Sequence, residues 1–173
     1  MSWSRRTLLV GAAAAVAACG FTPVYGPQGA ARGLRGQIAV DPPRDPEGYV
    51  LVRQLEDRLG RGSGGAAYRL SADIALAEDG LGITPDQEIT RRRLRANLAY
   101  RLTHTESGDV VASGTLRNFT SYSAPVFSAN RGTIAGNTVS VRAAEQDARE
   151  RLMTLLADQL VARLLATAPE WRR

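Results

Sequence analysis

The sequence predicts an α+β domain, in which a four-stranded, mainly antiparallel sheet carries two helices packed on one face, in the order β-α-β-β-β-α. Three successive segments alternate apolar and polar residues, which is typical of strands that rest one face on a core. Two other segments repeat apolar residues every three or four positions, as amphipathic helices do. Clusters of Gly, Pro and Asp separate the segments. Together these patterns indicate a single layer of helices on a sheet.

The first strand and the first helix are predicted between residues 34 and 59. Leu34 to Val40 alternates weakly and stops at Asp41-Pro42-Pro43, which indicates a short strand. Gly48 to Leu59 places Val52, Leu55 and Leu59 at helical spacing, which predicts a short amphipathic helix. The glycine-rich run that follows ends this helix.

The next segments predict the long strands of the sheet. From Tyr68 to Leu76 the even-numbered residues are apolar, and Glu78-Asp79-Gly80 is expected to begin a loop. In the third strand, the even-numbered residues from Leu94 to Leu102 are apolar, and the odd-numbered residues from Arg91 to Thr103 are mostly polar. Glu106-Ser107-Gly108-Asp109 predicts a hairpin turn, because glycine supplies the positive φ that such turns need. The fourth strand is expected from Val110 to Tyr122.

The longest periodic segment predicts the second helix. A polar loop from Ser123 to Asn137 precedes it, and apolar residues then recur every three or four positions from Val139 to Thr167. Glu145 and Arg149 form a favourable pair one helical turn apart, with the acid first. The helix is expected to end before Pro169.

The N-terminus has the features of a secretory signal. Arg5 and Arg6 precede a short apolar run from Leu8 to Ala18, which is too short to span a membrane. The run ends at Cys19, and Val16 to Cys19 resembles the lipobox of bacterial lipoproteins. We therefore expect cleavage between Ala18 and Cys19 and lipidation of Cys19; the alternative is an ordinary signal with a chance cysteine. The paired arginines leave both the general secretory route and the twin-arginine route open.

These segments divide the chain into a signal peptide (1–18), a lipidated tether (19–33), one domain (34–168) and a C-terminal tail (169–173). Removing 18 of the 173 residues leaves 155, the size of one ordinary domain. All 22 basic residues are arginines, so losing Arg5 and Arg6 leaves 20 against 17 acids, a net charge of +3. This mild basicity says little about partners, and we expect no nucleic-acid binding.

The sequence contains no pattern typical of an enzyme. His104 is the single histidine and lies next to the predicted hairpin turn, where a solvated strand-end residue is the expected role. With one histidine and one cysteine, a zinc site is not expected. No nucleophile motif or phosphate-binding loop occurs. We therefore expect no catalytic residues, no metal and no cofactor.

Several of these features together resemble the LptE family of lipopolysaccharide-assembly lipoproteins. The similarity includes the Cys-Gly-Phe start with its Pro-x-Tyr-Gly continuation (Cys19 to Gly26), the strand end Asn118 to Ser123, and the Ala/Glu/Arg/Leu-rich last helix, Ala143 to Leu165. The order of elements and the domain size agree with it. The Pro-x-Tyr-Gly form is similar to alphaproteobacterial members of the family.

The resemblance implies a non-enzymatic function in the outer membrane. LptE-like proteins sit as a plug inside the LptD β-barrel, help that barrel to assemble, bind lipopolysaccharide and take part in its insertion into the outer leaflet. Gly20, in place of the Asp that commonly retains lipoproteins in the inner membrane, points to the outer membrane. The alternative is a generic outer-membrane lipoprotein that scaffolds another envelope complex.

One group of residues is a candidate contact site for lipopolysaccharide or the barrel. Arg91, Arg93 and Arg95 lie on one strand face about 7 Å apart, where like charges repel unless an anion or an acidic partner lies between them. Guanidinium groups bind phosphate bidentately, and lipid A carries phosphates. Arg131, in the later loop, is a further candidate. The alternative is a solvated sheet face, partly neutralised by neighbours such as Asp73.

Overall fold

The computed structural model describes residues 29, 32–81, 91–124 and 135–172. The predicted signal peptide, the predicted lipidation site Cys19 and the candidate contact residue Arg131 lie outside the described residues. The statements made above about them therefore remain predictions.

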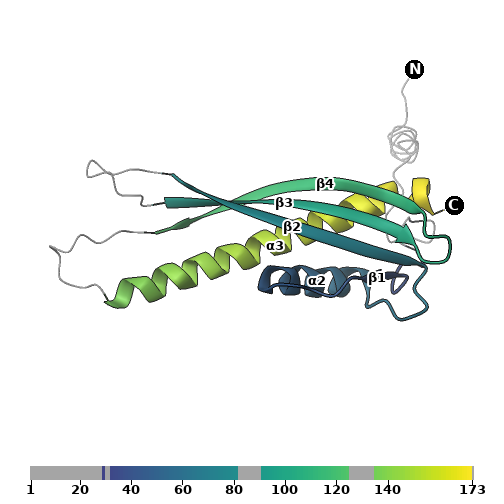
Figure 1. Ribbon diagram of the computed structural model, residues 1–173, viewed down its shortest axis with the longest axis horizontal. Helices are drawn as coiled ribbons and strands as arrows, with labels where there is room; N and C mark the ends of the chain where they lie inside the picture. Colours follow the sequence, from purple (N-terminus) through teal and green to yellow (C-terminus); the bar gives the residue numbers. More distant parts are fainter. Residues whose placement is uncertain (1–28, 30–31, 82–90, 125–134, 173) are drawn as a thin grey trace, which may run out of the picture.

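The described residues form one sheet with two helices on the same side, as Figure 1 shows. The strand order is β1-β2-β3-β4; β1 is parallel to β2, and the other neighbours are antiparallel. This confirms the predicted fold class and the order β-α-β-β-β-α. The elements are β1 (Ile38–Val40), α2 (Pro46–Leu59), β2 (Tyr68–Gly80), β3 (Arg91–His104), β4 (Val110–Ser123) and α3 (Ala135–Trp171).

The alternation in β3 sets which face of the sheet is the core. From Leu94 to Leu102 its even-numbered side chains are buried under the helices, whereas its odd-numbered ones lie mainly in solvent, as predicted. Full burial of a leucine side chain contributes roughly 1.5–3 kcal/mol, so this row anchors the sheet on the helices. The buried row consists of Leu94, Ala96, Leu98, Tyr100 and Leu102.

β2 is longer than the sequence predicted. It continues through Gly80, so the expectation that Glu78-Asp79-Gly80 begins a loop was wrong. The reason is pairing with β3: Arg92 Nη1 lies 2.7 Å from Glu78 Oε1, and Arg95 Nε lies 2.6 Å from Asp79 Oδ2. Cross-strand ion pairs stabilise the extended conformation, and the local turn propensity of these residues does not include them.

The hairpin between β3 and β4 agrees with the sequence. Gly108 has φ 77°, the left-handed conformation that glycine adopts without strain. His104 N donates to Asp109 O at 2.9 Å and closes the turn.

Helix α2 begins two residues earlier than predicted, at Pro46. Asp45 is its N-cap, with Asp45 Oδ1 accepting a hydrogen bond from Gly48 N at 2.6 Å, and Pro46 suits the first turn, where no N–H is needed. The helix buries Leu51, Leu55 and Leu59. It ends at Gly60, where φ is 78° and a Cβ would lie 2.7 Å from Arg35.

Helix α3 begins before and ends after its predicted bounds. The expected end before Pro169 was wrong, since the helix runs on to Trp171 with Pro169 inside its last turn. Trp171 is buried, its ring lies 5.0 Å from that of Tyr68, and its Nε1 donates to Leu164 O at 3.3 Å. This packing compensates for the hydrogen bond that proline cannot make. By length and composition α3 is apolar enough to cross a membrane, but half of that window is buried in the domain, so it is the core helix here.

Candidate functional site

The predicted arginine stripe lies on the sheet face that no helix covers. Arg91, Arg93 and Arg95 are odd-numbered residues of β3, whereas Leu94, between the last two, is buried under the helices. Extended backbone thus places the three guanidinium groups on one side of the sheet, as the sequence predicted. All three are at the end of β3 that pairs with the last residues of β2 and β4.

Arg95 has an acidic partner. Its Nε lies 2.6 Å from Asp79 Oδ2 and its Nη2 lies 2.9 Å from Asp79 Oδ1, a bidentate pair between β3 and β2. Both side chains are about half exposed, so water screens the pair. The neighbour considered from sequence, Asp73, forms a 3.5 Å ion pair with Arg44 instead.

Arg93 has an aromatic partner. Its guanidinium carbon lies 5.3 Å from the centre of the Phe119 ring, within the range of a cation–π contact. Arg93 Nε is shielded from solvent and has no hydrogen-bond partner. A desolvated donor without a partner costs about 1–3 kcal/mol, so this position favours an acceptor that relieves the cost.

The whole uncovered face is basic. Strands β2, β3 and β4 place six arginines and two aspartates on it, by their register. Two of the six are paired: Arg69 with Asp41, and Arg95 with Asp79. The other four have no carboxylate partner among the described residues; they are Arg91, Arg93, Arg101 and Arg117. An anion that approaches this face therefore meets guanidinium groups that remain available.

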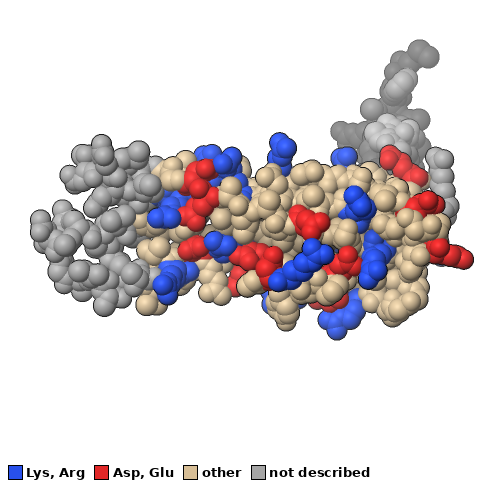
Figure 2. Space-filling model, viewed as in Figure 1, with Lys and Arg blue, Asp and Glu red and all other residues tan. Residues whose placement is uncertain are grey.

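A shallow groove of about 400 Å³ lies beside the stripe. It is lined by Ala77 on β2, Arg95 and Asn97 on β3, and Arg117 and Phe119 on β4. Phe119 is 60% exposed, so the groove offers an aromatic surface next to cations. Figure 2 shows basic and acidic side chains together at the left end of the described residues. An amphiphile with an anionic head fits this combination of surfaces.

Sequence reasoning missed Phe119, Asp79 and Arg117 as parts of this site. The available signal was the register of neighbouring strands: Arg95 is opposite both Ala77 and Phe119, and Arg93 is opposite Asp79. A single sequence does not reveal this register, because it depends on how the strands pair and pack in the folded sheet.

The opposite face of the same end carries a second charged group. Glu78 Oε1 accepts hydrogen bonds from Arg92 Nη1 at 2.7 Å and from the Tyr122 hydroxyl at 2.9 Å. The hydrogen bond from Arg92 is the main reason why the pKa of Glu78 lies below its usual value. Burial, helped by the bond to Glu78, raises the pKa of Tyr122 to about 12. These groups join all three long strands on the helix side.

Arg149 joins the two helices near this group. Its Nη1 lies 2.6 Å from Glu47 Oε1 in the first turn of α2, and its Nη2 lies 2.8 Å from Glu145 Oε1 on α3. The hydrogen bond to Glu47 is the main cause of a raised Arg149 pKa. Because all of these side chains are bonded to one another, they stabilise the domain rather than offer a free reactive group.

His104 is half-buried and packs edge-on against Tyr68, with ring centres 5.4 Å apart. Its Nδ1 accepts from Ser107 N at 3.3 Å, a contact within the hairpin. Among the residues that the structure describes, no three His, Cys, Asp or Glu side chains are placed to hold a metal ion. The fold and this sheet face together define an α+β domain with two helices on one face of its sheet and a basic opposite face.

Comparison with known proteins assigns this domain to a family. A family model described as "LptE: Lipopolysaccharide-assembly" matches residues 36–164, three quarters of the chain. The chain belongs to the LptE family of lipopolysaccharide-assembly proteins. No curated protein sequence matches it.

Solved structures share the fold at low sequence identity. A putative lipoprotein from Caulobacter crescentus is 22% identical, with a TM-score of 0.62 over 81% of this chain and 96% of that chain. An uncharacterized lipoprotein B from Nitrosomonas europaea is 14% identical, with a TM-score of 0.54 over 87% of this chain and 93% of that one. The rare lipoprotein B from Shewanella oneidensis is 8% identical, with a TM-score of 0.52 over 79% and 97%. At these identities the likeness concerns the fold alone.

Proposed function

We propose that this protein is an outer-membrane lipoprotein that plugs and helps assemble an LptD-type β-barrel, and that it takes part in lipopolysaccharide insertion into the outer leaflet. Membership in the lipopolysaccharide-assembly family over residues 36–164 is the observation that carries the proposal. The lipobox-like stretch ending at Cys19 supports the anchor, as does the fold shared with the putative lipoprotein from Caulobacter crescentus and the rare lipoprotein B from Shewanella oneidensis. The work of such a protein is binding, without catalysis.

The shape of the domain suits a plug. Figure 1 shows an elongated body in which the sheet and α3 run along the same long axis. Its uncovered sheet face is polar and basic, with arginines available to a partner surface. An elongated domain of this kind can place its uncovered sheet face along the inner wall of a barrel, while the helices on the other face form its core.

Co-expression with the candidate barrel tests the plug. The wild-type protein is expected to be recovered with the barrel as a one-to-one complex after membrane extraction and affinity purification. Recovery of the lipoprotein without a barrel would contradict the proposal. Recovery with a different envelope complex would favour the alternative, a lipoprotein that scaffolds that complex.

The arginine stripe is proposed as the lipopolysaccharide contact. Arg93 and Arg91 have no acidic partner among the described residues, and Arg95 needs only to exchange an exposed carboxylate for a phosphate. Each charge-assisted hydrogen bond lost costs about 1.5–3 kcal/mol, which is about tenfold or more in affinity. Arg131 remains a proposed contributor.

The test replaces Arg91, Arg93 and Arg95 together with Ser and measures lipopolysaccharide binding to the purified protein. A loss of about a hundredfold is expected. The matched control replaces the exposed Arg53, Arg142 and Arg163 of the helices with Ser, which changes the net charge equally. If both triple variants lose the same affinity, net charge and not the stripe determines binding.

A further inference from the structure

Phe119 is an exposed aromatic side chain among the arginines of the uncovered sheet face. It belongs to β4, lies opposite Arg95 of β3, and is 60% exposed. A single exposed apolar residue is common on protein surfaces and by itself indicates nothing. The neighbours of this ring are what make it a candidate binding group.

The two sides of the Phe119 ring have different neighbours. The guanidinium carbon of Arg93 lies over the ring, 5.3 Å from its centre. Arg117 precedes Phe119 by two residues in β4, so it lies beside the ring on the side away from Arg93. The groove of about 400 Å³ is on that side, because its lining includes Arg117 and Asn97 but not Arg93. One side of the ring is therefore covered by a cation, and the other borders the groove.

The polar groups of this groove suit an anionic ligand with hydroxyl groups. Arg117 has no carboxylate partner among the described residues, and the pair of Arg95 with Asp79 is half exposed and screened by water. Asn97 lies opposite Arg117 and is exposed, and its amide both donates and accepts hydrogen bonds. Two cations and one amide thus surround a flat apolar ring.

A phosphorylated sugar combines the groups that this lining recognises. The C–H groups on the face of a sugar ring pack on the electron-rich face of an aromatic ring, while its hydroxyls bind amides. Guanidinium groups bind its phosphate.

An acyl chain fits the groove less well. Among the lining side chains, only Ala77 and Phe119 are apolar and exposed, since Ala96 is buried. An acyl chain binds by the area that it removes from water, and in a shallow groove most of that area would remain wet. The sugar and phosphate of an amphiphile are therefore the better occupants.

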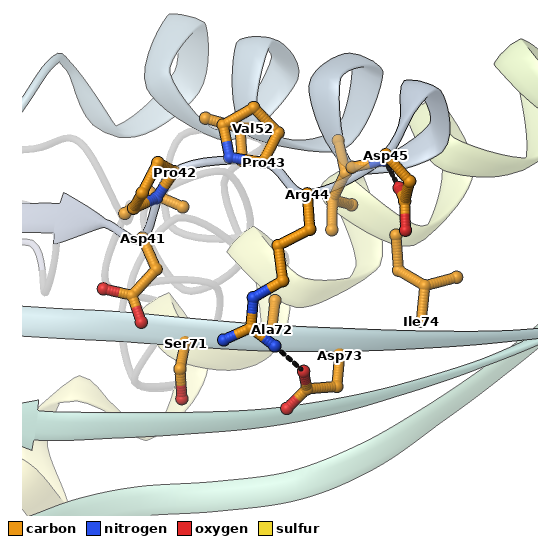
Figure 3. Close-up of a pocket in the computed structure, with 13 residues that line it drawn as sticks. Asp41, Pro42, Pro43, Arg44, Asp45, Val52, Ser71, Ala72, Asp73 and Ile74 are labelled. Atoms are coloured by element: carbon orange, nitrogen blue, oxygen red, sulfur yellow. Dashed lines mark hydrogen bonds and ion pairs between the residues drawn. The ribbon is translucent and has the colours of Figure 1, made fainter.

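A second groove on β2 shows a lining that an anion would avoid. It measures about 180 Å³ and lies between β2, the Pro42–Pro43 turn and the first turn of α2 (Figure 3). Its lining contains three aspartates, Asp41, Asp45 and Asp73, and one arginine. That arginine, Arg44, reaches across to Asp73, with Nη1 3.5 Å from Oδ1. Arg44 is therefore a suitable reference cation, exposed like Arg117 but outside the proposed subsite.

We propose that Phe119, Asn97 and Arg117 form a subsite for a phosphorylated sugar of the lipopolysaccharide head, and that Phe119 makes the protein prefer lipopolysaccharide to anionic phospholipids. The inference rests on the proposed function, because it assigns one part of lipopolysaccharide to one part of the sheet. The arginine stripe recognises phosphate, which phosphatidylglycerol also carries. Phosphatidylglycerol has no sugar ring, so a contact with such a ring favours one lipid over the other.

The experiment compares Phe119→Leu with Phe119→Tyr in the full-length purified protein. Leucine keeps an apolar side chain without a flat ring, whereas tyrosine keeps the ring. Binding is measured to lipopolysaccharide and to phosphatidylglycerol, each in mixed detergent micelles. We expect Phe119→Leu to bind lipopolysaccharide about tenfold more weakly and phosphatidylglycerol as well as the wild type does. Phe119→Tyr should match the wild type for both lipids.

A second pair of variants tests the cation of the subsite. Arg117→Ser and Arg44→Ser change the net charge equally, and both side chains are exposed. We expect Arg117→Ser to weaken lipopolysaccharide binding about tenfold, and Arg44→Ser to leave it unchanged. The deacylated head of lipid A, a phosphorylated glucosamine disaccharide, should compete with lipopolysaccharide for the wild-type protein and less well for Phe119→Leu.

The outcomes separate this inference from the proposed function. If the wild-type protein binds no lipopolysaccharide, the proposed lipopolysaccharide binding fails and the subsite with it. If it binds lipopolysaccharide and Phe119→Leu matches Phe119→Tyr, the inference alone fails. Equal losses for both lipids, or a deacylated head that does not compete, would make an acyl chain the occupant and overturn the inference. Phe119→Leu that loses barrel recovery but binds lipopolysaccharide normally would make the barrel wall the occupant, with the same result. Thermal unfolding identifies a misfolded variant, and the Arg117 pair then decides.

Discussion

Arg149 shows how one residue holds two elements together. Its guanidinium bonds Glu47 on α2 and Glu145 on α3, and all three side chains are no more than about one third exposed. In this setting a missing cation leaves two carboxylates close together and partly desolvated. Arg149 and Glu47 are 102 residues apart in the sequence, so the local sequence pattern does not predict their ion pair.

We therefore expect Arg149→Ala to destabilise the domain by about 1–3 kcal/mol, because it leaves half-buried carboxylates without a partner. Denaturant unfolding of the soluble domain measures the change. Arg151→Ala is the control on the same helix, since Arg151 pairs with Asp147 in a largely exposed position and should cost under about 0.5 kcal/mol. Equal losses in the two variants would contradict a special role for Arg149.

Tyr122 predicts a dependence of stability on alkaline pH. Burial and the bond to Glu78 raise the pKa of Tyr122 to about 12, whereas the unfolded value is 10.0. Between these values the unfolded chain releases a proton that the folded protein retains. The free energy of unfolding should therefore fall as pH rises from about 10 to 12. In Tyr122→Phe this part of the decline should disappear; the difference in tyrosinate absorbance between the two proteins measures the titration. A tyrosine that titrates near 10 would refute the prediction.

At the scale of elements, α3 shows packing overriding local propensity. Proline ends most helices, yet α3 passes Pro169 and reaches Trp171. The indole of Trp171 packs edge-on against Tyr68 and donates to Leu164 O and Thr167 Oγ1. The last turn of α3 is thereby joined to the start of β2, a contact between residues that are about 100 positions apart in the sequence.

Trp171→Ala should accordingly destabilise the domain by about 3 kcal/mol, through a cavity against Tyr68 and the loss of the last turn. Trp171→Phe keeps a ring but loses the indole donor, and we expect a cost of about 1 kcal/mol. Thermal unfolding followed by circular dichroism gives both values. If Trp171→Ala unfolds at the wild-type temperature, the last turn contributes nothing to the fold.

At the scale of the whole molecule, the two faces of the sheet differ in composition and in what covers them. One face packs on α2 and α3 and holds the core. The other carries six arginines and remains uncovered by the described residues. Since α2 and α3 complete the core on one side, no described residue covers the other face, which is the side that we propose for the partner.

The anchor itself is testable. Cys19→Ser removes the thiol that would carry diacylglycerol, and several acyl chains on one residue anchor a protein stably. We expect the variant to remain unprocessed and to incorporate no radiolabelled palmitate, while the wild-type protein becomes labelled and sediments with outer membranes. Wild-type protein that is cleaved but carries no label would indicate an ordinary signal peptide.

Much of the fold could be predicted because its signals are local. The alternation from Arg91 to Thr103 predicts a strand, the face of the sheet that is buried, and the position of the arginine stripe. All three follow because successive side chains of a strand point to opposite faces. The same locality explains the errors at Glu78 to Gly80 and at Pro169. There, turn propensity and proline stereochemistry compete with cross-strand ion pairs and with the packing of Trp171, which come from distant parts of the chain.

The sequence alone determined the fold class, the basic strand face and the expected lipid anchor, because each depends on residue types at short spacing. Only the tertiary structure decided that Asp79 neutralises Arg95 and that Phe119 lies beneath Arg93. These facts depend on strand register. Register is a relation between segments far apart in the chain, and it is set by the packing of all of them together.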